Sequence, residues 1–117
     1  MEASEKGNKR ARLALEMFSY RIRTTIGTYS AVLGGVDAIA FTGGLGETSC
    51  VCRSEVLSGL EYLGIELDKE ANEKNIGGQR LINSEDSKVS VMVIPANEEL
   101  MIAMDTDELT RDLTTKR

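Results

Sequence analysis

Two short segments of the chain contain residues suited to binding a phosphate and a metal ion. The first, residues 41–48, has the sequence FTGGLGET. Its glycines let a ligand approach the backbone closely, and the helix start expected after them supplies free N–H groups that attract anions. The segment has neither the Gly-Lys-Ser/Thr end of a Walker A loop nor a Gly-x-Gly-x-x-Gly pattern. Two interpretations stay open: a phosphate or nucleoside site, and a tight strand-to-helix turn that binds nothing.

The second segment, residues 95–99, has the sequence PANEE. Mg²⁺ usually binds one or two protein carboxylates together with water and substrate phosphates, so the two glutamates are suitable ligands. Asn97 is also a good N-cap, and acidic residues are common in a first helical turn because the helix dipole stabilises them. A metal site and an ordinary helix start are both consistent with this segment.

Each segment is expected to connect a buried strand to a helix. Residues 36–42 and 89–94 are short apolar runs beside glycine, proline or turn-forming residues, which favours buried strands. The first segment should be a loop, with Thr48 or Ser49 as the N-cap of a helix that reaches Leu63. If the strands pair in parallel, both segments lie at one edge of the sheet, where ligands of such sheets bind.

The remaining sequence predicts a long helix, a short helix and a hairpin. Apolar residues three or four positions apart indicate a helix over residues 8–33. A short helix is expected at 69–75, and residues 80–82 and 88–94 flank a cluster of turn formers. This order of elements is typical of an α/β fold. The apolar positions of the long helix are Ala11, Leu15, Phe18, Ile22, Ile26, Tyr29 and Leu33.

Composition and charge exclude several classes of protein. Histidine is absent, which removes catalytic triads with histidine, Cys-His pairs and His-ligated metals. The net charge of −5 and the few aromatic residues indicate no nucleic-acid partner. The N-terminal residues lack the apolar region of a signal peptide, and no apolar run is long enough for a membrane span. Cys50 and Cys52 are expected to be free thiols in a reducing cytoplasm.

Three stretches, taken in order, resemble the acetate kinase family. VDAIAFTGGLGETSCVCRSEVL is similar to the family signature, in which Gly-Gly-Ile-Gly-Glu-Asn-Ser precedes a helix. VMVIPANEELMIAMDT is similar to the family's Val-Ile-Pro-Thr-Asn-Glu-Glu-Leu-x-Ile-Ala-x-Asp-Thr, and GNKRARLALEMFSYRIRTTIGTYSAVLGGVDAI to the helix before the signature. Residues 65–87 also match the family's connection. The resemblance runs from about residue 6 to residue 109 and covers the C-terminal part of a family member.

The resemblance implies a partial ribonuclease-H-like domain of the sugar kinase, Hsp70 and actin type, with parallel core strands flanked by helices. Residues 8–109 would be the C-terminal part of the acetate kinase C-terminal domain, residues 1–7 a disordered N-terminus and residues 110–117 a tail. Family members transfer the γ-phosphoryl group of ATP reversibly to acetate with Mg²⁺, in a cleft between two such domains. Propionate and butyrate kinases are relatives that this segment does not separate from acetate kinases.

By the same resemblance, Glu98 corresponds to the family's magnesium-linked glutamate. Thr48 replaces a family Asn and so loses the amide's paired donor and acceptor, and Ala96 replaces a family Thr. The family's catalytic residues and acetate pocket lie upstream, so no catalytic residue is expected within this sequence. The family's ADP-binding loop falls on Gly44, Leu45, Gly46, Glu47 and Thr48.

The expected role is therefore a share in a nucleotide and magnesium site. ATP or ADP and Mg²⁺ are the implied ligands, with acetate or another short acyl acid bound by the upstream part. The chain alone is not expected to phosphorylate acetate. Because the family dimerises through its C-terminal domain, a homodimer is implied. The alternatives are a fragment that binds nucleotide without catalysis and a dimerisation fragment.

Overall fold

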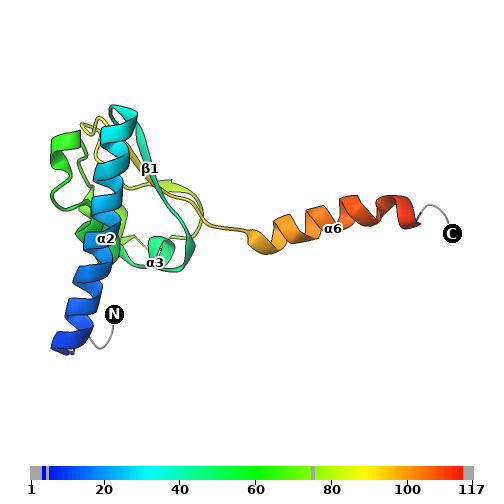
Figure 1. The fold of residues 1–117 in the computed structure, drawn as a ribbon, viewed down its shortest axis with the longest axis horizontal. Helices are drawn as coiled ribbons and strands as arrows, with labels where there is room; N and C mark the ends of the chain where they lie inside the picture. Colours follow the sequence, from blue (N-terminus) through cyan, green and yellow to red (C-terminus); the bar gives the residue numbers. More distant parts are fainter. Residues whose placement is uncertain (1–3, 5, 75, 115–117) are drawn as a thin grey trace.

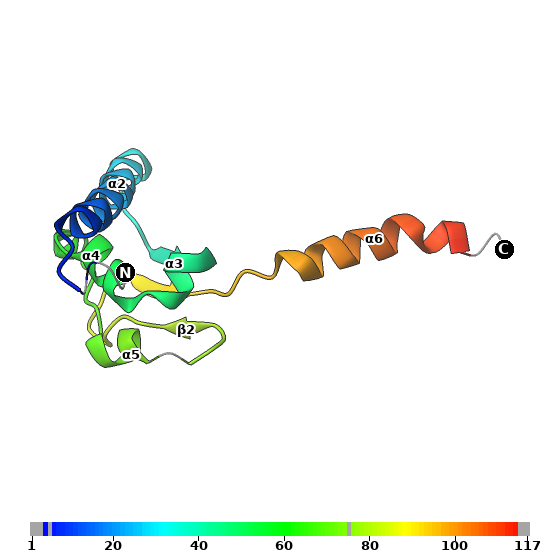
Figure 2. The ribbon, with the colours of Figure 1, turned by 90° about the horizontal axis from the view of Figure 1, so that it is seen from below.

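The described chain consists of a body and one helix that projects from it (Figure 1). The computed structural model describes residue 4, residues 6–74 and residues 76–114. The body runs from α2 (Lys9–Leu33) to β3 (Ser90–Val93), and α6 (Glu98–Thr114) extends away from it in both views (Figures 1 and 2). The second candidate segment therefore lies where the body meets the projecting helix.

A three-stranded sheet runs through the body in the order β1-β3-β2. β1 (Ala38–Phe41) pairs in parallel with β3, so that Ala38 lies opposite Ser90 and Phe41 opposite Val93. β2 (Arg80–Leu81) pairs antiparallel with β3. The predicted parallel pair and hairpin are confirmed, although all three strands are shorter than predicted. Since Phe41 and Val93 end their strands side by side, the segments that follow them leave the sheet at the same edge.

The core lies between this sheet and the helices that cover it. Ile22 and Ile26 of α2 pack against the buried core residues. α4 (Cys50–Leu57) contributes three buried apolar side chains to the core. The structure is thus an α/β fold with helices beside parallel core strands, as predicted. The buried apolar residues are Phe41, Cys52, Val56, Leu57, Leu60, Ile65, Ile82, Val89, Val91 and Val93.

α2 is the long helix predicted over residues 8–33. Asn8 caps its start, because its side chain accepts hydrogen bonds from the N–H groups of Arg10 and Ala11 at 3.0 and 3.1 Å. Gly34 ends it in the left-handed conformation at a φ of 76°. The predicted apolar face is only partly buried. Its exposed members are Phe18, Tyr29 and Leu33.

The predicted second helix is divided in two. α4 ends at Leu57, and Gly59 follows with a φ of 88°, which breaks the helix before the short 3-10 helix η1 (Glu61–Leu63). The prediction of one continuous helix to Leu63 was therefore wrong. The short helix predicted at 69–75 is confirmed as α5 (Lys69–Glu73).

The two ends of the chain differ in how far the structure tests their predictions. α6 continues through Thr114, so residues 110–114 are helical where we expected a tail. Residues 1–3 and 5 of the predicted disordered N-terminus, and residues 115–117 of the tail, lie outside the described residues. Among the helices of the described part, none is long and apolar enough to cross a bilayer.

Candidate functional site

The glycine-rich segment is a short helix and not the loop that we predicted. α3 (Gly43–Thr48) follows Thr42, which makes no side-chain cap bond. The Thr48 hydroxyl donates to the Gly44 carbonyl within α3 at 2.6 Å. Ser49, the other predicted cap, is the N-cap of α4, because its hydroxyl accepts the Cys52 N–H at 3.0 Å.

The two candidate segments meet at the edge of the sheet, as predicted. The Ile94 N–H donates to the Phe41 carbonyl at 2.8 Å and extends the parallel ladder by one bond. Beyond it, one oxygen of Glu47, Oε1, accepts the Gly43 N–H at 2.8 Å and the Ala96 N–H at 2.9 Å. The half-buried Glu47 carboxylate thus joins α3 to the segment that leads into α6.

The predicted nucleotide-binding residues differ in how far they are exposed to solvent and therefore to a ligand. Gly44, Leu45 and Thr48 are exposed, whereas Gly46 and Glu47 are half-buried. A Cβ at Gly44 would have no atom within 4 Å, but one at Gly46 would lie 3.4 Å from the backbone carbon of Phe41. A Cβ at Gly46 would thus be in van der Waals contact with the end of β1, with little room beyond it, whereas Gly44 leaves backbone open to solvent.

A hollow of about 400 Å³ lies beside α3. It is mostly apolar, and it lies between α2, the end of β1, α3 and the start of α4. It gives the exposed side of the glycine segment an apolar neighbour of the kind found in small-molecule sites. The residues around it are Phe18, Ile22, Ala40, Phe41, Thr42, Leu45, Gly46 and Cys52.

Arg53 is a residue of this region that the sequence analysis missed. It is only 2% exposed. Its Nη1 donates to the carbonyls of Gly46 and Glu47 at 2.8 and 3.0 Å, at the C-terminal end of α3. Its Nε and Nη2 donate to the side-chain and backbone oxygens of Asn72 at 2.7 and 2.8 Å. No local signal marks it, since an arginine within a helix is usually exposed.

Two features of its environment disfavour the charged form of the Arg53 guanidinium. Burial lowers the pKa of Arg53, and the positive charge of Arg80 lowers it further. An arginine is nonetheless charged in proteins, so four hydrogen bonds must replace its hydration. All four acceptors belong to α3 and α5. Arg53 therefore fixes both elements to α4.

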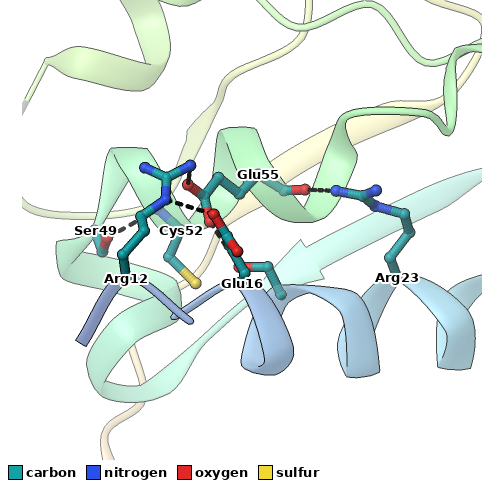
Figure 3. Close-up of polar contacts among 7 residues, drawn as sticks. Arg12, Glu16, Arg23, Ser49, Cys52 and Glu55 are labelled. Atoms are coloured by element: carbon teal, nitrogen blue, oxygen red, sulfur yellow. Dashed lines mark hydrogen bonds and ion pairs between the residues drawn. The ribbon is translucent and has the colours of Figure 1, made fainter. Parts of the chain in front are cut away.

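Charged side chains also fasten α2 to α4 (Figure 3). Arg12 pairs with Glu16 at 2.8 Å and with Glu55 at 3.1 Å, and the Ser19 hydroxyl donates to Glu55 at 3.3 Å. Arg23 donates to two backbone carbonyls near the end of α4. None of these residues belongs to either candidate segment. They hold α2 against the helix that carries Arg53.

Glu98 lies in the first turn of α6 and is exposed. Asn97 accepts the Leu100 N–H at 3.2 Å, which confirms its predicted capping contact. Within the described residues, no group of three or more His, Cys, Asp or Glu side chains could hold a metal ion. Glu98 can thus supply one carboxylate and no complete coordination sphere.

Most of the chain matches one protein family. A sequence model of the acetokinase family covers residues 1–104. The chain belongs to the acetokinase family. An acetate kinase of Clostridium botulinum (strain Hall) is 62% identical over 108 residues, which cover 92% of this chain and 27% of that protein. This acetokinase chain therefore spans about a quarter of the length of that relative.

Solved structures of an acetate kinase and a propionate kinase share the fold. The crystal structure of Porphyromonas gingivalis acetate kinase matches with a TM-score of 0.81 and 45% identity, over 90% of this chain and 26% of that one. A propionate kinase from Francisella tularensis subsp. tularensis SCHU S4 matches with a TM-score of 0.76 and 38% identity, over 87% and 26%. The predicted fold class, a partial α/β domain of this type, is confirmed.

The two thiols of this acetokinase chain are free, as predicted. Cys50 is half-buried, and Cys52 is buried beside the apolar hollow. Burial raises the pKa of the Cys52 thiol, which therefore stays protonated at neutral pH. Its role is packing in the core.

Proposed function

We propose that this acetokinase chain is the C-terminal part of an acetate kinase. It supplies a nucleotide-binding segment, residues 44–48, and the magnesium carboxylate of Glu98 to a cleft completed by residues outside it. The reaction of the whole enzyme is ATP + acetate ⇌ ADP + acetyl phosphate, with Mg²⁺. The observation that carries the proposal is the junction of both segments at Glu47, in a chain 62% identical to an acetate kinase.

The geometry of α3 supports contact with a nucleotide. Gly44 has open space around it, so a ligand can approach the backbone there. Leu45 is 41% exposed at the rim of the apolar hollow, which suits the apolar surface of a nucleoside. Transfer of a phosphoryl group depends on positioning and charge neutralisation, and these residues would contribute positioning.

The exposed carboxylate of Glu98 fits Mg²⁺ bound to a nucleotide. Mg²⁺ commonly takes only one or two protein carboxylates and completes its coordination with water and phosphate oxygens. When bound, the metal would neutralise negative charge on the phosphates. Glu98 would hold it near the segment that positions the nucleotide.

Titration of Mg·ADP into the chain, followed by calorimetry, tests both roles. We expect weak, saturable binding, because part of a site lacks much of the preorganisation of the whole. Glu98→Ala should abolish the strengthening by Mg²⁺, a loss of roughly tenfold for one charged ligand, and leave binding of ADP alone unchanged. Glu99→Ala, at the neighbouring exposed position, is the control and should behave like the unaltered chain. No saturable binding, together with concentration-dependent association, would favour the dimerisation fragment instead.

Incubation of the chain with ATP, Mg²⁺ and acetate should give no acetyl phosphate. By the family resemblance, the catalytic residues lie upstream of the matched segment, and the chain has no histidine. The measurement is acetyl phosphate formed over a range of chain concentrations, with a full-length acetate kinase as positive control. Product that increases in proportion to the chain would contradict the proposal.

The family assignment supports three further proposals about the whole enzyme. The acyl acid is acetate in the first instance, with propionate or butyrate as alternatives because residues outside this chain select it. We also propose that the whole enzyme is a homodimer. We propose a cytoplasmic location as well, because two free thiols are in keeping with a reducing compartment.

A further inference from the structure

Glu47 is the residue at which the two candidate segments are joined. Its Oε1 atom accepts hydrogen bonds from the N–H groups of Gly43 and Ala96. Ala96 lies 49 residues further along the chain than Glu47. A single carboxylate oxygen thus bridges the start of α3 and the connection between β3 and α6.

Both N–H groups need an acceptor that regular secondary structure does not give them. Gly43 is the first residue of α3, where an N–H has no partner within the helix, and Thr42 provides no side-chain cap. Ala96 lies between β3 and α6, beyond the end of the parallel ladder. A carboxylate is a strong acceptor for such groups because its charge shortens and strengthens the bonds.

The backbone of Glu47 also accepts a hydrogen bond from a buried side chain. Buried Arg53 donates to the carbonyl of Glu47 and to that of Gly46 before it. The carboxylate therefore extends from an immobilised backbone to Ala96, two residues before Glu98. Movement of Glu98 relative to α3 requires this bridge to break or the backbone of residues 96 and 97 to rotate.

We propose that Glu47 is a positioning residue, whose carboxylate holds residues 95–97, and with them Glu98, at a fixed place relative to the nucleotide-binding segment. The inference rests on the proposed function, because it gives Glu47 its part within that site. It differs from direct nucleotide contact. The oxygen of Glu47 that the structure engages is already occupied by two backbone donors.

Hydrogen exchange of backbone amides in the ¹⁵N-labelled chain, without ligand, tests the bridge itself. In Glu47→Ala we expect the Ala96 amide to exchange roughly tenfold faster, the fold-change for loss of one hydrogen bond. The Ile82 amide, which donates to Val91 in the sheet, is the internal control and should not change. Unchanged exchange at Ala96 would overturn the proposal.

Glu47→Gln is a second variant for the case that Glu47→Ala does not fold. It keeps one side-chain oxygen of similar reach but removes the charge, so Ala96 should exchange faster by a smaller factor. If Glu47→Ala does not fold, this variant decides. Exchange at Ala96 equal to that of the unaltered chain would then overturn the proposal.

A double-variant comparison of Mg·ADP binding separates positioning from contact. If Glu47 acts through Glu98, Glu47→Ala abolishes the effect of Mg²⁺, and Glu47→Ala with Glu98→Ala loses no more than either alone. Losses that multiply would indicate direct contact with the nucleotide and overturn the proposal. Absence of any ADP binding by the unaltered chain would count against the proposed function, while hydrogen exchange would still decide whether the bridge exists.

Discussion

Arg53→Ala is expected to lower the free energy of unfolding by about 3–5 kcal/mol, a large share of the ~5–15 kcal/mol that stabilises a typical domain. The substitution removes four hydrogen bonds from a residue that is 2% exposed. It leaves the carbonyls of Gly46 and Glu47 and both oxygens of Asn72 without their donor in a buried region. Urea unfolding, followed by NMR signals of buried body residues such as Val91, measures the loss.

Two further variants show whether the effect belongs to the buried guanidinium. Arg21→Ala removes an exposed arginine from α2 and should change the free energy of unfolding by no more than about 0.5 kcal/mol. Arg53→Lys keeps the charge but not the planar fork, so it should recover only part of the loss. A loss below about 1 kcal/mol in Arg53→Ala would mean that water replaces the lost donors, contrary to this account.

Gly46→Val is expected to weaken Mg·ADP binding by more than roughly tenfold, because overpacking of about 1–3 kcal/mol must be relieved by moving α3. The first added carbon would lie 3.4 Å from the backbone carbon of Phe41 and 3.5 Å from its Cβ. Valine adds two methyl groups beyond that carbon. α3 must then move from the end of β1 and carry the proposed nucleotide contacts with it. Calorimetric titration with Mg·ADP, beside a urea unfolding curve, measures both consequences.

Gly44→Ala is the matched control on the same helix. Its new Cβ meets no atom within 4 Å, so the free energy of unfolding should stay the same or rise slightly. If the nucleotide approaches the backbone at Gly44, this variant weakens binding without destabilising the chain. Binding by Gly46→Val equal to that of the unaltered chain would contradict the role proposed for α3.

The sheet and the long helix could be predicted because their signals are local. β1 and β3 lie within apolar runs that end at glycine or proline. α2 carries apolar residues at helical spacing and stops at a glycine pair. The parallel pairing then placed both candidate segments at one edge. The residue types suggested the nucleotide and metal roles, the family resemblance favoured them over the alternatives, and both roles stay predictions.

The form of the glycine segment could not be predicted in the same way. Three of the six residues of α3 are glycines, which favour a loop over a helix when only the local sequence is considered. The helix is stabilised by distant partners: Arg53 binds its last carbonyls and Glu47 its first N–H. Arg53 in turn depends on Asn72, and Glu47 on Ala96. No periodic pattern in the sequence encodes such contacts.

The projection of α6 divides the unfolding of the chain into two stages. Its residues from Glu98 to Arg111 are all exposed, and a lone helix of 17 residues is marginal in water because packing provides most helix stability. We therefore expect α6 to melt before the body and to add little to its cooperativity. Glu98 sits at the boundary between these stages. If Glu47 positions Glu98 as proposed, the place of Glu98 depends on the body, which is expected to unfold after α6.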